Sequence, residues 1–152
     1  MDTLKNLYRI GHGPSSSHTM APRRAAGIFI ADHPNTASVR VTLYGSLAAT
    51  GREHLTDVAI REVLLPRPVE FVWKPGEELP EHPKGMVFEA MDASGEVTAT
   101  RTFFSVGGGA LRDDPDSKPL YPLSTIEKIL AHCEDSGQSF WEYVESCEGK
   151  EI

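Results

Sequence analysis

Hydrophobic and polar positions in the first half of the chain follow the periods of short helices and strands. Residues 39–44 alternate between apolar and polar side chains, a period of two that indicates a half-buried strand. A proline near the start and the apolar residues after it predict a helix over residues 22–31. A short helical turn is expected at residues 46–50. A second helix should run through residues 58–64, because prolines follow it.

The second half of the chain predicts a hairpin and two helices. Residues 86–91 and 97–106 are apolar or β-branched, and Asp92-Ala93-Ser94-Gly95 separates them, so we expect an antiparallel pair. Two helices separated at Gly137 are predicted from two capping boxes: Ser124-x-x-Glu127 and Ser139-x-x-Glu142. The predicted fold class is α+β, an antiparallel sheet packed with helices, and residues 1–152 are expected to form one domain.

Composition and charge narrow the classes of function. The chain is 39% hydrophobic and 24% charged, as in ordinary globular proteins. No run of about 18 apolar residues predicts a membrane span, and the N-terminal residues lack a secretory signal, so we expect a cytoplasmic protein. The formal net charge is −7, from 22 acidic and 15 basic residues. This balance disfavours nucleic acid as a partner, because binding to its backbone depends on Lys and Arg.

The cysteine content limits the metal chemistry of this chain. Cys133 and Cys147 are its 2 cysteines, too few for a disulfide scaffold, and we expect free thiols. An iron–sulfur cluster or a structural zinc ion normally takes about three or four thiolates. We therefore predict no metal ligands in this chain.

The strongest local signal is a polar run that ends where the first helix begins: Gly11-His12-Gly13-Pro14-Ser15-Ser16-Ser17-His18-Thr19. A helix N-terminus exposes N–H groups and about half a positive charge, so hydroxyls and amides there suit a carboxylate or a phosphate. The alternative is that Ser17 or Thr19 only caps the helix. One cap needs one hydroxyl, whereas five consecutive polar side chains occur here.

Two further segments carry candidate chemistry. His54 lies in a polar loop before a helix, where an imidazole can act as acid, base or ligand, or can be an ordinary surface residue. Ser105 is followed by Gly107, Gly108 and Gly109 at the end of a strand. Their amides would form either an anion-binding loop or a tight turn alone.

Four motifs in one order resemble the β domain of iron–sulfur-dependent bacterial L-serine dehydratases. The motifs are Gly13-Pro14-Ser15-Ser16-Ser17-His18-Thr19, Val41-Thr42-Leu43-Tyr44-Gly45-Ser46-Leu47, Gly51-x-x-His54-x-Thr56-Asp57 and Ser105-x-Gly107-Gly108-Gly109. The chain is also similar to the allosteric substrate-binding domain of D-3-phosphoglycerate dehydrogenase, which supports the α+β fold class.

The resemblance implies an L-serine ammonia-lyase, which converts L-serine to pyruvate and ammonia in serine catabolism and gluconeogenesis. It implies a [4Fe–4S] cluster ligated by cysteines of a separate α domain or chain, and a homo-oligomer of the full enzyme. This chain would be the β half, either a piece of a single-chain enzyme or a short subunit. The alternative function is a non-catalytic anion- or effector-binding module of the allosteric type.

The resemblance also assigns roles to residues of this sequence. It places His18 and His54 in catalysis. Substrate binding falls to four neighbouring residues: Ser15, Ser16, Ser17 and Thr19. Glycine is the more frequent family residue where Leu55 stands, so we expect the loop that carries His54 to shift.

Overall fold

The computed structural model describes residues 15–112, 121–123 and 125–149, which fall into two compact units, a larger one over 15–112 and a smaller one. Gly11, His12, Gly13 and Pro14 of the polar run, and Ser124 of the first capping box, lie outside the described residues. The expectation of one domain over the whole chain stays a prediction. No helix within the described ranges is long and apolar enough to cross a membrane.

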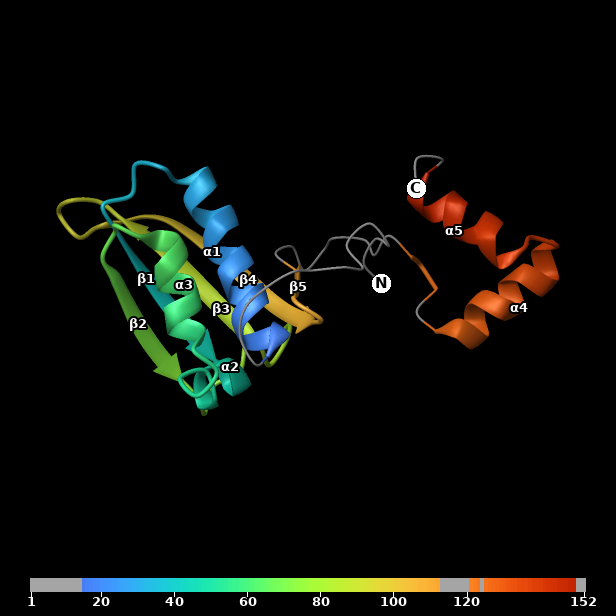
Figure 1. Cartoon of the computed structure of the whole chain (residues 1–152), viewed down its shortest axis with the longest axis horizontal. Coiled ribbons are helices and arrows are strands. Elements are labelled where there is room, and N and C mark those ends of the chain that lie inside the picture. Colours follow the sequence, from blue (N-terminus) through green and yellow to red (C-terminus); the bar gives the residue numbers. More distant parts are fainter. Residues whose placement is uncertain (1–14, 113–120, 124, 150–152) are drawn as a thin grey trace. The chain divides into compact units, whose positions relative to one another are not determined.

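A five-stranded sheet forms the centre of the larger unit (Figure 1). Its strands, in the order β2-β1-β3-β4-β5, are β1 (Ser38–Tyr44), β2 (Val69–Lys74), β3 (Gly85–Met91), β4 (Val97–Gly107) and β5 (Ala110–Arg112). The predicted hairpin is confirmed, because β3 pairs antiparallel with β4. Strands β1 and β3 are also antiparallel, and so are β4 and β5. The predicted α+β class is therefore confirmed.

One strand pair departs from the expected antiparallel sheet. Strands β1 and β2 run parallel, with Val41 opposite Phe71. A parallel pair needs a crossover connection, and the helix α3 (Thr56–Leu64) lies in the chain between the two strands. The short strand β5 was not predicted, because three residues carry no readable alternation.

The larger unit contains three α-helices and one wider turn. The helices are α1 (Ala21–Asp32), α2 (Gly45–Ala49) and α3, all close to the predicted ranges. The π-helical turn η2 (Ser16–Met20) leads directly into α1. Helices α1 and α3 cover one face of the sheet (Figure 1).

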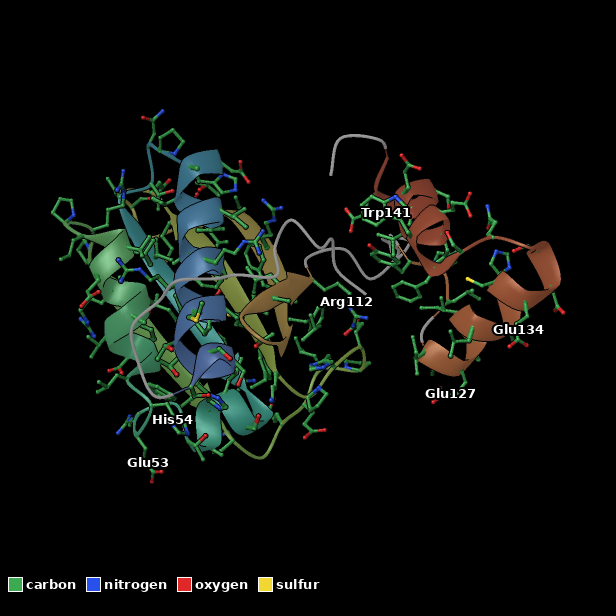
Figure 2. All side chains as sticks on the ribbon, turned by 45° about the vertical axis from the view of Figure 1, so that its right-hand side comes forward. Glu53, His54, Arg112, Glu127, Glu134 and Trp141 are labelled. Carbon is green, nitrogen blue, oxygen red and sulfur yellow. The ribbon has the colours of Figure 1, made fainter. Side chains whose placement is uncertain are left out.

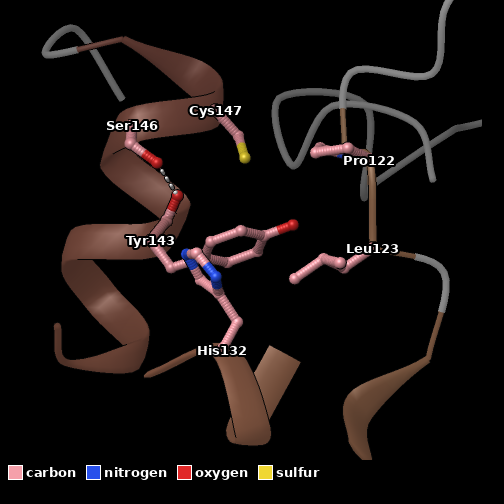
Figure 3. Close-up of a pocket in the computed structure, with 6 residues that line it drawn as sticks. All are labelled: Pro122, Leu123, His132, Tyr143, Ser146 and Cys147. Carbon is pink, nitrogen blue, oxygen red and sulfur yellow. Dashed lines mark hydrogen bonds between the residues drawn. The ribbon is translucent and has the colours of Figure 1, made fainter. Parts of the chain in front are cut away.

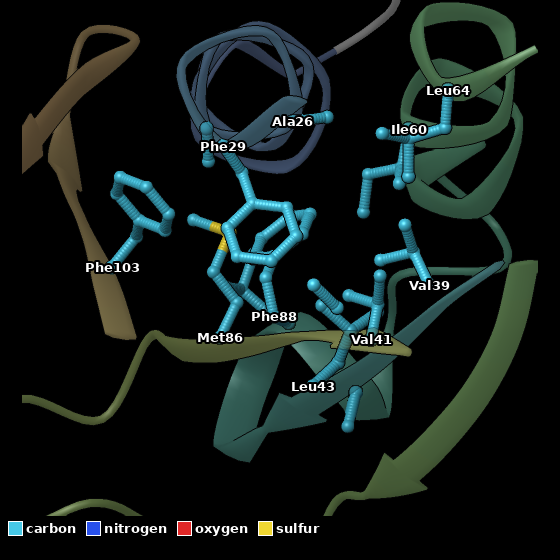
Figure 4. Packing of buried hydrophobic residues seen from close by; sticks show 14 residues of the cluster. Ala26, Phe29, Val39, Val41, Leu43, Ile60, Leu64, Met86, Phe88 and Phe103 are labelled. Carbon is cyan, nitrogen blue, oxygen red and sulfur yellow. The ribbon is translucent and has the colours of Figure 1, made fainter. Parts of the chain in front are cut away.

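The hydrophobic core lies between these two helices and the sheet. Phe29 points from α1 onto Phe88 of β3, with ring centroids 5.4 Å apart, and Ile60 and Leu64 point inward from α3 (Figure 4). The alternating side chains of β1 that enter this core are Val39, Val41 and Leu43. The period of two therefore correctly identified the buried face of the central strand.

The smaller unit contains the two predicted C-terminal helices, α4 (Ile126–Ser136) and α5 (Phe140–Glu148). The Ser139 capping box is present, since Ser139 accepts from the Glu142 amide and Glu142 accepts from the Ser139 amide. Helix α4 is capped by Thr125 instead of Ser124. A cavity of about 430 Å³ is lined by six residues of this unit (Figure 3): Pro122, Leu123, His132, Tyr143, Ser146 and Cys147.

Two adjacent leucines test where the core ends. Leu64 is fully buried, whereas Leu65 is 62% exposed. We predict that Leu64→Ala lowers the free energy of unfolding by about 2–5 kcal/mol, because it removes apolar contacts and leaves a cavity. Leu65→Ala is the matched control and should change it by less than about 0.5 kcal/mol. Urea denaturation measures both, and equal losses would contradict this description of the core.

Candidate functional site

The serine-rich run folds into the turn η2 at the N-terminal end of α1. The Ser15 carbonyl accepts the backbone N–H groups of His18 and Thr19, at 3.1 and 2.9 Å. The Thr19 hydroxyl donates to the same carbonyl at 2.6 Å. Met20 is the N-cap of α1 and makes no side-chain cap bond, so the alternative that Ser17 or Thr19 caps the helix is wrong.

The His18 ring is hydrogen-bonded at both nitrogens. Its Nδ1 lies 3.1 Å from the Ser15 hydroxyl and 3.0 Å from the Ser17 hydroxyl. Its Nε2 lies 3.2 Å from the Ser46 carbonyl oxygen and 3.1 Å from the Thr50 hydroxyl. A carbonyl oxygen can only accept a hydrogen bond, so Nε2 carries the proton. The Thr50 hydroxyl donates to the same carbonyl at 3.1 Å and offers a lone pair to Nε2.

The surroundings of His18 favour its neutral form. Burial lowers the pKa of His18 below its ordinary value, while the hydrogen bond to the Ser46 carbonyl opposes this shift. Positive charge on His54 and on Lys84 lowers the pKa of His18 further. A neutral ring with a proton on Nε2 has a lone pair on Nδ1. A hydroxyl of Ser15 or Ser17 therefore donates to the ring.

His54 lies beside His18 on the loop between α2 and α3. The two ring centroids are 4.8 Å apart, and the ring planes are inclined by 48°. Backbone hydrogen bonds hold the loop, since the His54 amide donates to Thr50 and the Thr56 amide donates to Gly51. Figure 2 shows the His54 side chain at the end of the larger unit where α2 lies. Among the described residues, the His54 ring has no hydrogen-bond partner.

Leu55, which follows His54, adopts a left-handed backbone conformation. Its φ is 58° and its ψ is 36°, the only positive φ among the described residues other than glycine. Glycine reaches this region without steric cost, whereas other residues pay for the contact between Cβ and the backbone. Leu55 therefore takes the conformation that a glycine would favour and keeps the tight entry into α3.

Ser105 and the glycines after it shape the other side of the turn. Ser105 is fully buried, and its hydroxyl donates to the Ser17 carbonyl at 2.9 Å. Gly108 and Gly109 have φ of +56° and +76° and connect Gly107 to its strand partner Ala110. Two positive φ values in a two-residue hairpin loop are the requirement of a type I′ turn. The glycines thus form the predicted tight turn, and their anion-binding role stays a prediction.

Sequence reasoning missed several contacts of His18. Ser46 and Thr50 are four residues apart on α2 and its C-cap, so a helix places them on the same face. This spacing was the one signal in the sequence that both could approach the same ring. Thr56 was quoted in a motif, but its bond to the His18 carbonyl, at 2.6 Å, has no local signature. Lys84 was not predicted at all. It comes near His18 from the start of β3.

The Ser46 hydroxyl is a buried polar group that lacks a hydrogen-bond partner among the described residues. Gly45, just before it, has φ +51°, and a Cβ there would lie 2.1 Å from the Pro83 carbonyl oxygen. Only glycine fits this position, so the backbone that presents Ser46 is tightly fixed. The carbonyl of the same residue accepts from His18, and its unpartnered hydroxyl is a group that a bound polar ligand would satisfy.

The residues of this chain do not fit an iron–sulfur cluster. The sequence has 2 cysteines, and Cys133 and Cys147 both pack against the Tyr143 cluster of the smaller unit. Two thiols are fewer than such a cluster takes. Across the described residues, no group of three or more His, Cys, Asp or Glu side chains is placed to hold a metal ion.

Comparison with known proteins finds one matching family and several similar proteins. Residues 3–66 and 61–116 match the family described as serine dehydratase beta chain. L-serine dehydratase of Streptomyces coelicolor is 31% identical over 88% of this chain and 41% of that protein. L-serine dehydratase 1 of Escherichia coli is 29% identical over 91% of this chain and 41% of its own length. The chain therefore spans about two fifths of these relatives.

A relative with higher identity covers less of the chain. L-serine dehydratase of Mycobacterium bovis is 36% identical over 68% of this chain and 31% of that protein. The family match spans all the site segments, including the serine turn, the His54 loop and the strand that carries Ser105.

The depressed pKa of His18 predicts a pH-dependent stability. The unfolded chain takes up a proton near pH 6.5 and the folded chain at lower pH, so stability falls as pH drops from about 7.5 to about 5.5. His82 adds to the same trend, because burial, Arg112 and Lys84 lower its pKa. Urea unfolding across this range should show the decline, and His18→Gln should weaken it. An equal decline in the wild type and in His18→Gln would contradict the prediction.

The left-handed Leu55 predicts an unusual order of stability. Leu55 is 52% exposed, so shortening its side chain loses little burial. Leu55→Gly relieves the strained backbone and Leu55→Ala does not. We therefore expect the glycine variant to exceed the alanine variant by about 1 kcal/mol in free energy of unfolding. Urea denaturation of both variants measures the difference, and an alanine variant as stable as the glycine variant would contradict it.

Proposed function

This chain belongs to the serine dehydratase beta chain family, and from that premise we propose that it forms part of an L-serine ammonia-lyase. The reaction converts L-serine to pyruvate and ammonia. In the proposal an α domain or chain supplies the [4Fe–4S] cluster and its cysteines, and the full enzyme is a homo-oligomer. This chain contributes side chains for substrate binding and for proton transfer.

The observation that carries the proposal is the group of three hydroxyls and two imidazoles at the N-terminal end of α1. Ser15 and Ser17 contact the neutral His18, and the His54 ring lies 4.8 Å from the His18 ring. This arrangement exceeds what a helix cap requires. The family relatives named L-serine dehydratase act, by their name, on a substrate whose functional groups such a site matches.

The serine hydroxyls are assigned to the substrate carboxylate. One hydroxyl of Ser15 or Ser17 donates to Nδ1 of His18. The other lies 3.3 Å from it and donates to its oxygen, and in the proposal it turns this proton to the carboxylate when the substrate binds. The hydroxyl of Ser16 has no partner within the described part of the chain. The Thr19 proton is committed to the Ser15 carbonyl, so Thr19 offers only lone pairs. The helix end adds partial positive charge.

His54 is assigned to removal of the proton from Cα of L-serine. Histidine is the side chain that titrates nearest neutral pH, and the His54 ring is not committed to another described residue. Loss of the Cα proton and of the β-hydroxyl as water gives 2-aminoacrylate. Its imine tautomer takes up water and releases ammonia and pyruvate, so one water leaves and one enters.

His18 has a supporting role in this scheme. Its Nε2 proton is bound to the Ser46 carbonyl, and its Nδ1 accepts a serine proton, so neither nitrogen is available to the Cα proton of the substrate. The neutral ring orders the hydroxyls that meet the carboxylate. Ser46, whose carbonyl accepts from His18, also has a buried hydroxyl without a partner among the described residues, and this hydroxyl would bind a polar atom of the substrate.

Pyruvate formation tests the proposal. The chain and its cysteine-rich α partner are co-expressed in iron-replete, anaerobic cells, and we expect pyruvate from L-serine only with both present. His54→Ala should lower kcat by about 100- to 10,000-fold, because the proton acceptor is lost. His33→Ala is the control, since His33 lies at the other end of α1 and should leave kcat unchanged.

Two results would contradict the proposal. Full activity of His54→Ala would remove His54 from proton transfer. A cluster-loaded pair that forms no pyruvate would favour the anion- or effector-binding module, and isothermal titration of the chain with L-serine and with inorganic phosphate would then measure that binding.

A further inference from the structure

We propose that Thr56 and Ser105 are positioning residues, whose buried hydroxyls hold η2 by its backbone carbonyls and so fix the ring of His18. The catalytic consequence rests on the proposed function. The structural part does not, because it concerns contacts within this chain.

Pro22 creates the need for outside donors. In an α-helix each carbonyl accepts from the N–H four residues later, but Pro22 has no N–H to offer the His18 carbonyl, and its ring would clash with it. The chain responds with the wider π-turn, in which the Ala21 N–H donates to the Ser16 carbonyl five residues before it. The Ala21 N–H would otherwise donate to the Ser17 carbonyl, four residues before it. The Ser17 and His18 carbonyls therefore both lack the N–H donor that an α-helix would give them.

Two hydroxyls from distant segments take their place. The Thr56 hydroxyl, at the start of α3, donates to the His18 carbonyl at 2.6 Å. The Ser105 hydroxyl, on β4, donates to the Ser17 carbonyl at 2.9 Å. Both donor residues have no exposed surface. The turn is held from two sides by side chains that make no hydrogen bond to the His18 ring among the described residues.

The position of this backbone determines the contacts of the ring. His18 Nε2 reaches the Ser46 carbonyl and Thr50, and Nδ1 reaches Ser15 and Ser17, at distances between 3.0 and 3.2 Å. Hydrogen bonds weaken steeply with small changes of distance and angle. A displaced carbonyl at residue 18 would therefore release the fixed tautomer and the ordered serine hydroxyls together.

Nitrogen NMR of the full chain tests the structural part. In the wild type, His18 should show a protonated Nε2 and an unprotonated Nδ1. In Thr56→Val and Ser105→Ala, we expect averaged signals from both tautomers and a His18 pKa that moves up toward its ordinary value. The charged neighbours His54 and Lys84 are unchanged in these variants. Thr56→Ser keeps the donor and should restore the wild-type signals.

Thr42→Val is the matched control for loss of a buried threonine hydroxyl. Thr42 is 7% exposed on β1 and makes no hydrogen bond to η2 among the described residues. Its variant should keep the wild-type His18 signals. Equal changes in Thr42→Val and Thr56→Val would indicate general loosening and overturn the proposal. If Thr56→Val does not fold, Ser105→Ala decides by the same criterion.

Kinetics of the enzyme assembled with its α partner test the catalytic part. Misplaced catalytic groups cost on the order of 100-fold in rate, so Thr56→Val should lower kcat by about that factor with a smaller change in KM. Thr56→Ser should recover most of the activity. Wild-type signals and kcat in Thr56→Val would overturn the proposal. An assembled wild-type enzyme that does not turn over L-serine would instead refute the proposed function, while the NMR comparison would still decide the positioning role.

Discussion

The hydrogen bond from His18 to the Ser46 carbonyl is the constraint on which the site depends. A carbonyl has no proton to give, so the bond fixes the Nε2 tautomer and leaves a lone pair on Nδ1. That lone pair orders the hydroxyls of Ser15 and Ser17. Burial holds the ring in its neutral form. The protonation of one imidazole thus commits the proton of one of the two serine hydroxyls to the ring.

Local patterns were sufficient for most elements and insufficient for their pairing. The alternation in β1 and the prolines around α1 and α3 set their positions, because these signals reside in consecutive residues. The parallel pairing of β1 with β2 depends on the path of α3 across the sheet and has no local signature. Thr125 caps α4, and the backbone conformation at this one position decides between it and the neighbouring Ser124. The sequence pattern does not specify that conformation. The similarity to the allosteric domain of D-3-phosphoglycerate dehydrogenase stays a prediction.

The site shows the same division between local and long-range information. The serine run and His54 were found from their own motifs, and the resemblance to L-serine dehydratases is confirmed by the family match. Their convergence required the fold, since the contacts of His18 come from α2, from Thr50 at its C-terminal end and from the start of α3. Lys84 has no motif, and only the fold brings its charge, from just before β3, near His18. The assigned catalytic roles stay predictions.

The closeness of the two imidazoles limits how much positive charge the site can hold. With ring centroids 4.8 Å apart, a proton on either ring repels a second proton on the other. Because positive charge on His54 lowers the pKa of His18, that charge favours the neutral His18 whose Nδ1 accepts from a serine hydroxyl. Charge on one ring is thus linked to the hydrogen bonding of the other.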